Sequence, residues 1–186
     1  MSYFSSFPNL KTERTSLRQL RRKDAEDLYY LRTDDRVYTY LDRETYHTID
    51  QAYEFIHNIN AGVSSGNWIM WAIVLQKTGR VVGTVCLWKF DFLERKAEIG
   101  YELHPDYQGK GIMTEVVNRI IHYGFSNLKL ETIEAVTNAL NTKSLNLLET
   151  QQFDRVRIFH EIDSRGRSVN MAVYRLRQQS FRRVKD

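Results

Sequence analysis

The sequence predicts an α/β fold in which helices cover both faces of a mixed sheet. Adjacent β-rich runs at 68–92 and 97–103 are divided only by short turns, which is typical of antiparallel hairpins. After residue 97, strand and helix patterns alternate, which is typical of βαβ units. The chain of 186 residues is 42% hydrophobic and 12% aromatic, so it can form one domain, 1–186, with a large core.

Each element of the first half follows from a local pattern. Alternating polar and apolar residues predict the first strand, and two later runs of β-branched and aromatic residues predict a hairpin whose turn contains Gly79. Helix-capping residue types precede two stretches of helically spaced apolar residues. The expected elements are a strand at 15–20, a helix after Asp24, a helix begun by Thr48 or Asp50, and strands at 68–75 and 81–92.

The second half begins with a turn at 91–95 and ends with a hairpin. Apolar residues recur at helical spacing after the glycine pair Gly109 and Gly111, and a capping residue, Asn141, precedes a shorter helical stretch. We expect flexible ends at 1–11 and 178–186. The expected elements between them are a strand at 97–103, a helix at 112–128, a strand at 132–137, a helix at 141–150, and a hairpin of 154–162 and 169–176.

Composition excludes several classes of protein. The single cysteine, Cys86, excludes an internal disulfide, and its apolar surroundings predict a buried thiol. The five histidines show no ligand spacing, so we expect no metal site. No apolar run spans a bilayer and no signal pattern opens the chain, so we expect a cytoplasmic protein. The net charge of +4 comes from basic clusters near both ends and gives nucleic-acid binding only weak support.

The segment 96–114 contains the most informative motif, a turn with two glycines between a predicted strand and a predicted helix. Backbone N–H groups at a helix start attract negative charge, and glycine lets a ligand approach the backbone closely. The segment therefore predicts a phosphate site. The P-loop spacing is excluded because position 104 is His, and the dinucleotide fingerprint because position 114 is Thr.

The remaining match is to the acyl-CoA pyrophosphate loop of the GNAT acetyltransferases, which this chain resembles over roughly residues 12–177. Gln108 and Gly111 match the loop, whereas Met113 departs from its usual Gly or Ala. The sequence Ala97-Glu98-Ile99-Gly100-Tyr101 and an Asn-x-x-Ser helix start at Asn141 add to the resemblance, with Gln152 in place of the usual Gly after that helix. Glu161 and the stretch 169–171 resemble the RimJ/RimL-type branch, which acetylates protein N-termini. The resemblance implies a mostly antiparallel sheet of about seven strands.

The resemblance also implies acetyl-CoA as cosubstrate and a set of residues that hold it. The strand before the loop diverges from its neighbour in that family, and its backbone binds the pantetheine. The amides of the loop bind the pyrophosphate, with added charge from Lys110. Asn141 is suited both to bind the cofactor and to cap its own helix. The implied cofactor-binding residues are Tyr101, Glu102, Leu103, Gln108, Gly109, Lys110, Gly111, Ile112, Met113, Thr114, Asn141 and Ser144.

Catalytic roles come from the same resemblance. Many members use a tyrosine as acid on the Asn-x-x-Ser helix, but Leu148 stands at that position here. The RimJ/RimL-type branch instead implies Ser144 as the acid that protonates the departing thiolate. It implies Glu161 as general base, with Glu98 as the reserve candidate. Each carboxylate can equally be an ordinary strand residue, and a water relay can replace either.

Four functions remain open from the sequence. The leading one is an N-acetyltransferase that acts on a protein N-terminus, such as that of a ribosomal protein. The others are acetyl transfer to a small amine such as a polyamine or aminoglycoside, CoA sensing without turnover, and nucleic-acid binding. We expect residues 24–66 to shape the acceptor pocket. We expect a monomer or a homodimer.

Overall fold

The computed structural model describes residues 6–37, 39–40 and 45–181. In these residues one sheet has the strand order β1-β2-β3-β4-β5-β6-β8-β7. Every neighbouring pair is antiparallel except β5 and β6, so the predicted mixed, mostly antiparallel sheet is confirmed. The strands are β1 (Leu10–Lys11), β2 (Thr15–Arg18), β3 (Ile69–Leu75), β4 (Val81–Asp91), β5 (Lys96–Leu103), β6 (Thr132–Asn138), β7 (Asp154–Ile162) and β8 (Ser168–Arg177).

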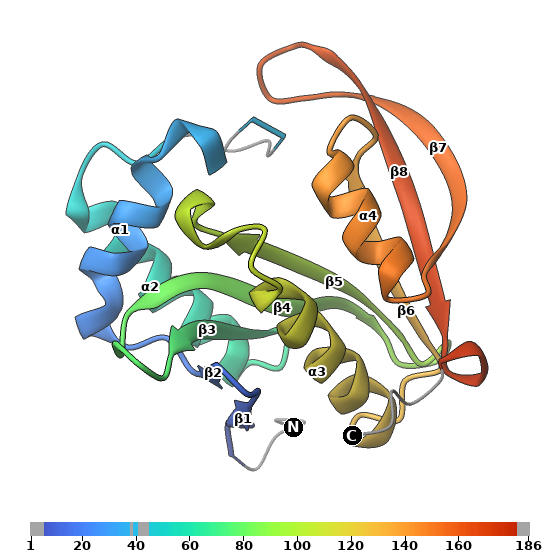
Figure 1. The fold of residues 1–186 in the computed structure, drawn as a ribbon, viewed down its shortest axis with the longest axis horizontal. Coiled ribbons are helices and arrows are strands. Elements are labelled where there is room, and N and C mark those ends of the chain that lie inside the picture. The colour runs from blue at the N-terminus through green and yellow to red at the C-terminus, as the bar shows by residue number, and fades with distance from the viewer. Residues whose placement is uncertain (1–5, 38, 41–44, 182–186) are drawn as a thin grey trace.

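Helices cover both faces of the sheet, as the sequence predicts (Figure 1). On one face, α1 (Ala25–Thr33) and α2 (Ile49–Ser64) pack on β3 and β4 around a core that includes Leu28 and Ile56. On the other face, α3 (Ile112–Ser126) and α4 (Thr142–Thr150) cover a larger core that contains Trp71 and Ile120. None of the described helices is long and apolar enough to cross a membrane.

The ends of the chain differ from the sequence expectation. Leu10 is buried and pairs with Leu17, so Leu10–Lys11 form an edge strand inside a segment expected to be flexible. Two residues are too few to show alternation, which is why the sequence does not reveal this eighth strand. Near the other end, Gln178–Ser180 form a 3₁₀ turn. The rest of the predicted flexible ends, 1–5 and 182–186, lies outside the described residues.

One predicted helix end has a different local structure from that expected, and another has the turn that the resemblance implies. The Asp24 carboxylate does not cap α1; it accepts a hydrogen bond from the Arg21 N–H at 2.7 Å and pairs with Arg18 at 2.6 Å, which closes a 3₁₀ turn before the helix. After α4, Gln152 has a φ of 65°. This left-handed conformation favours glycine, which explains why glycine is usual at this position in the resembling family.

The arrangement that creates the site is the divergence of β5 from β6. The two strands pair in parallel only from Lys96 to Glu98 of β5, although β5 continues to Leu103. Beyond that point β6 keeps its pairing with β8 as far as Asn138. A split therefore opens between two neighbouring strands in the middle of the sheet.

Candidate active site

The backbone of β5 presents alternate residues to this split. The His104 N–H donates to the Val82 carbonyl of β4 at 2.8 Å. Because antiparallel pairing alternates, the backbone groups of Glu102 point to β4 and those of Tyr101 and Leu103 point toward β6. The Leu103 carbonyl accepts a hydrogen bond from the Gln108 side-chain amide at 2.9 Å. The Tyr101 backbone and the Leu103 N–H are therefore the groups of this segment that are placed to bind a ligand in the split.

The backbone of Glu102 pairs with β4 and does not face the split, and its side chain makes a separate buried contact. Its carboxylate accepts hydrogen bonds from Arg32 of α1 at 2.7 Å and from Thr84 of β4 at 2.9 Å. The side chains of Arg32 and Glu102 are each 3% exposed. This buried ion pair fixes the end of α1 to the part of β5 that has left β6.

The loop after β5 has the shape of an anion cradle. A 3₁₀ turn, Pro105–Tyr107, leads into Gln108, and Gly109 and Gly111 follow with φ values of 71° and 75°. Gly111 is the N-cap of α3, so the first N–H groups of that helix have no helical acceptor. These amides and the helix dipole together favour a phosphate at this position.

Basic side chains around the loop differ from the sequence prediction. Lys110 is turned away: its ammonium donates to the Asp106 carbonyl at 2.7 Å, and it does not line the cleft. Lys143 of α4 instead lies beside the loop, where its ammonium donates to the Gln108 side-chain carbonyl at 2.9 Å. Arg14 supports the loop through the Lys110 carbonyl at 2.6 Å and pairs with Glu115. The sequence does not reveal these two roles, because only tertiary contacts bring Arg14 and Lys143 to the loop.

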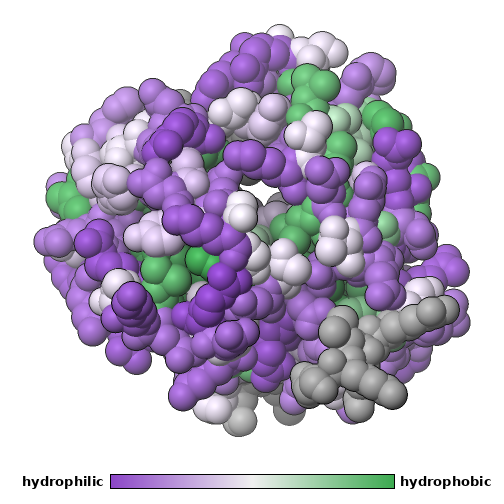
Figure 2. Space-filling view, in the orientation of Figure 1, coloured by the Kyte–Doolittle hydropathy of each residue, from purple (hydrophilic) through white to green (hydrophobic). Residues whose placement is uncertain are grey.

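A cleft of about 950 Å³ connects the split, the loop and α4. Figure 2 shows the surface hollowed at the centre of the face that carries α3 and α4. All predicted cofactor-binding residues except Lys110 line this cleft. The lining residues are Arg36, Val37, Thr39, Tyr40, Tyr101, Glu102, Leu103, Pro105, Tyr107, Gln108, Gly109, Gly111, Ile112, Met113, Thr114, Asn141, Thr142, Lys143, Ser144, Asn146, Leu147 and Thr150.

A pair of hydroxyl groups lies where α4 faces β5. The Asn141 side chain caps α4 by accepting the Ser144 N–H at 3.2 Å, which places the serine in the first turn. The Ser144 hydroxyl is 2.9 Å from the Tyr101 phenol. Burial raises the pKa of Tyr101 to about 12, so the phenol keeps its proton at neutral pH. Leu148 is fully buried, so the phenol that lies beside Ser144 comes from Tyr101 of β5 and not from α4.

The two candidate bases do not line the cleft but share one face of the sheet. Glu98 alternates with the core residues of β5 and lies beside Glu134 of β6. Cross-strand pairing then leads from Glu134 through β8 to β7, where Glu161 stands opposite Val169 on the same face. Buried surroundings raise the pKa of Glu98, and Lys89 at 3.0 Å opposes that rise. Glu161 is exposed.

The residues present fit acetyl-CoA. Loop amides and Lys143 can hold the pyrophosphate, and the open backbone of β5 can bind an extended chain with amide groups. An N–H of β5 that faces the split can also polarise a thioester carbonyl. Within the described ranges, no three His, Cys, Asp or Glu side chains gather to hold a metal ion.

Comparison with known proteins agrees with this geometry. The family model described as "Acetyltransferase (GNAT) domain" matches residues 14–154. The chain is 31% identical over 173 residues to p20, an uncharacterized N-acetyltransferase of Bacillus licheniformis, and the match covers 92% of this chain and 97% of the relative.

Solved structures of acetyltransferases share the fold of this chain. RimJ from Mycobacterium smegmatis, in complex with CoA-disulfide, superimposes with a TM-score of 0.80 at 19% identity and covers 92% of this chain and 88% of its own. Spermidine N-acetyltransferase from Vibrio cholerae, in complex with CoA and spermine, has a TM-score of 0.78 at 23% identity and covers 90% and 97%. The expected resemblance to the GNAT acetyltransferases is confirmed, and the likeness to RimJ is one of fold. The chain belongs to the GNAT acetyltransferase family and is an acetyl-CoA-dependent N-acetyltransferase.

Proposed function

We propose that the acceptor is the N-terminal amino group of a protein, and the charge of the described cleft lining supports this most directly. Glu102 is the one carboxylate among the described lining residues, and Arg32 already neutralises it. The lining also contains the cations Arg36 and Lys143. A polyamine carries several positive charges and needs several unpaired carboxylates, whereas a peptide end brings only one positive charge.

The open half of the sheet provides room for such a chain. The helices α1 and α2 pack at the β3–β4 end, away from β6, β7 and β8 (Figure 1). The face of β6–β8 that also carries Glu161 is apolar along its middle, where Val136 pairs with Val173 and Phe159 pairs with Met171. An extended peptide can lie on this floor with its amino group at the β5–β6 split. A ribosomal protein is one acceptor of this class.

In this proposal the acceptor loses its proton on one face of the sheet, and the departing thiolate gains a proton on the other. An acceptor ammonium must lose a proton before its nitrogen can form the new bond to the acetyl carbon. In our proposal Glu161 takes that proton, directly or through water, with Glu98 as the reserve base. As the carbon–sulfur bond breaks, Ser144 gives its proton to the thiolate sulfur and recovers a proton through the Tyr101 phenol and water. The polarised carbonyl oxygen is held by a backbone N–H of β5.

Ser144→Ala should lower kcat about tenfold and leave the KM for acetyl-CoA nearly unchanged. This is below the usual range for one general acid, because the Tyr101 phenol remains in reach. Tyr101→Phe should have a similar effect. In each single variant the remaining hydroxyl can still supply a proton, so the fall in kcat of the double variant should exceed the product of the two single falls. Steady-state kinetics measures all three. Equal losses in cofactor affinity would instead assign Ser144 a binding role.

A panel of acceptors tests the proposed substrate class. CoA-thiol release is measured with peptides that have free N-termini, with the same peptides α-acetylated but containing lysine, and with spermidine. We expect turnover with free N-termini, little with the blocked peptides, and little with spermidine. Preference for spermidine would contradict the proposal and favour a small-amine enzyme. Tight acetyl-CoA binding without turnover of any amine would favour a sensor.

A further inference from the structure

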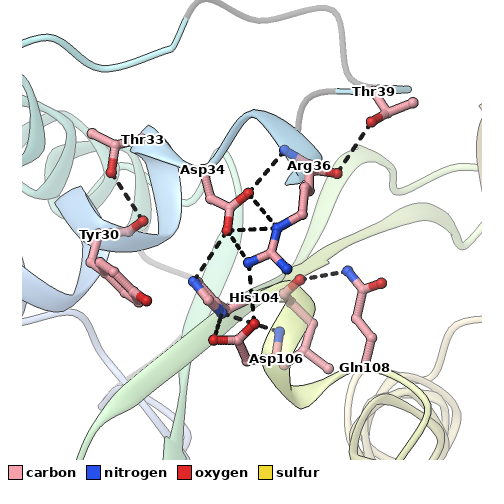
Figure 3. A network of polar contacts seen from close by, with 9 residues as sticks. Tyr30, Thr33, Asp34, Arg36, Thr39, His104, Asp106 and Gln108 are labelled. Atoms are coloured by element: carbon pink, nitrogen blue, oxygen red, sulfur yellow. Dashed lines mark hydrogen bonds and ion pairs between the residues drawn. The ribbon is translucent and has the colours of Figure 1, made fainter.

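The two walls of the cleft are joined by a polar network at the end of β5 (Figure 3). Asp34 directly follows α1, and Arg36 lies in the 3₁₀ turn Asp35–Val37. The Arg36 guanidinium donates to both Asp34 oxygens at 2.6 to 3.1 Å and to Asp106 at 3.1 Å. Asp106 belongs to the turn Pro105–Tyr107 that begins the phosphate loop. One guanidinium thus bridges two segments about 70 residues apart.

His104 lies behind this bridge as a buried support. Its ring is 2% exposed and stacks on Tyr30 of α1, with ring centroids 4.6 Å apart. Its Nε2 is 3.6 Å from Asp34, and its Nδ1 accepts the Asp106 N–H at 3.3 Å. The hydrogen bonds from Arg36 keep the pKa of Asp34 below its usual value, so this carboxylate stays charged across the neutral range. The anchoring residues are therefore fixed on both sides of Arg36.

The network joins two parts of the cleft that, in the proposed function, would face different substrates. Arg36, Val37 and Tyr40 line the wall that comes from the α1 side, whereas Gln108 and Gly109 of the loop line the pyrophosphate end. The Lys110 ammonium binds the Asp106 carbonyl, so Asp106 is also attached to the loop itself. A ligand that orders the loop therefore also favours the position of the opposite wall.

The Arg36–Asp106 contact is exposed to solvent, unlike the buried Arg32–Glu102 pair. The side chain of Arg36 is 62% exposed and that of Asp106 is 55% exposed, so solvent screens their attraction and the contact can open. The Arg32–Glu102 pair is buried, and it holds the start of the wall in place whether or not the bridge is formed. Residues 35–37 can therefore have two positions, one bridged to the loop and one released, while Asp34 stays beside His104.

We propose that Arg36 is a positioning residue that couples donor binding at the loop to the acceptor-side wall through its bridge from Asp34 to Asp106. This inference rests on the proposed use of the cleft by both substrates. Acetyl-CoA on the loop favours the bridged state, and the bridged wall completes the acceptor site. By linkage, the acceptor strengthens donor binding by the same factor.

Arg36→Gln and Asp106→Asn test the coupling from its two ends. Asp106 does not line the cleft, so its effect on an acceptor is indirect, and Arg36 is the cleft residue to which its carboxylate is hydrogen-bonded. In the wild type we expect the acceptor KM to fall about fivefold or more as acetyl-CoA rises to saturation, a typical coupling. Both variants should lose this dependence, and the double variant should behave like either single variant. Additive effects, or a retained dependence in Asp106→Asn, would overturn the proposal.

A measurement that needs no acceptor tests the coupling through Arg36 independently of the proposed function. Hydrogen exchange should show that acetyl-CoA protects the amides of residues 34–37 in the wild type but not in either variant. Arg80→Gln is the matched control, because Arg80 is equally exposed, pairs with Asp27 of α1 and lies outside the cleft; it should keep the protection. Protection that survives in both bridge variants would overturn the coupling even if peptide turnover is confirmed. Protection lost only in the bridge variants supports it even if no peptide is acetylated.

Discussion

Gly111→Val is expected to weaken acetyl-CoA binding by about ten- to hundredfold while the chain remains folded. Gly111 has a φ of 75°, and an added Cβ would lie 3.2 Å from the Arg14 guanidinium that supports the loop. Holding a β-branched residue in this conformation costs on the order of 1–3 kcal/mol. Relief of that strain moves the amides away from the pyrophosphate, and each 1.4 kcal/mol lost is a factor of ten in affinity. Calorimetric titration with acetyl-CoA measures the change.

Gly79→Val is the matched control for this prediction. Gly79 has a φ of 71° in the β3–β4 turn, and an added Cβ there would meet nothing within 4 Å. The control should therefore lose a similar amount of stability, visible as a lower thermal midpoint, and keep its affinity for acetyl-CoA. If Gly111→Val binds acetyl-CoA as tightly as Gly79→Val does, the loop does not hold the pyrophosphate.

Glu161→Gln is expected to lower kcat/KM by roughly a hundredfold, the lower range for lost acid–base help. A glutamine cannot accept the acceptor's proton, so the acidic limb of the pH profile should also flatten. Asp154→Asn is the control, since it removes an exposed carboxylate at the other end of β7 and should change neither quantity. Wild-type activity in Glu161→Gln would contradict the role that the branch resemblance implies.

Lys89→Met distinguishes Glu98 from Glu161 as the base. Burial raises the pKa of Glu98, and the Lys89 ammonium at 3.0 Å limits this rise. Removing the cation should raise that pKa further, so Glu98 would stay protonated to a higher pH. If Glu98 is the base, the acidic limb of kcat/KM moves to higher pH in Lys89→Met. If Glu161 is the base, the limb stays where it is, which is our expectation.

Much of the fold could be predicted because local sequence patterns indicate most of its helices and strands. Strands β3 to β8 and helices α1 to α4 each show periodicity or a cap within a few residues. Strand β1 does not, since Leu10–Lys11 joins the sheet only through its contact with Leu17. The Asp24 carboxylate likewise bonds to its own turn and to Arg18, a choice that local preference does not determine.

The site divides in the same way between local and tertiary information. The glycine loop and the Asn141 cap are local motifs, and the structure places them at one cleft. Strand alternation places Glu98 and Glu102 on the same face of β5. It does not predict that Arg32 neutralises Glu102. The positions of Lys143 and Arg36 depend on α4 and α1 approaching the loop from either side, which only the assembled fold determines.

A crystal structure with acetyl-CoA tests the central claim. This claim is that the donor lies in the β5–β6 split, with its acetyl group directed to the face of the sheet that carries Glu98 and Glu161. We predict the pyrophosphate on the amides of residues 108–114, beside Lys143. We predict the thioester oxygen within hydrogen-bonding distance of a backbone N–H of β5 that faces β6, and the acetyl carbon on the side of Glu98 and Glu161. A pyrophosphate bound away from the loop, or an acetyl group directed away from both carboxylates, would contradict the account.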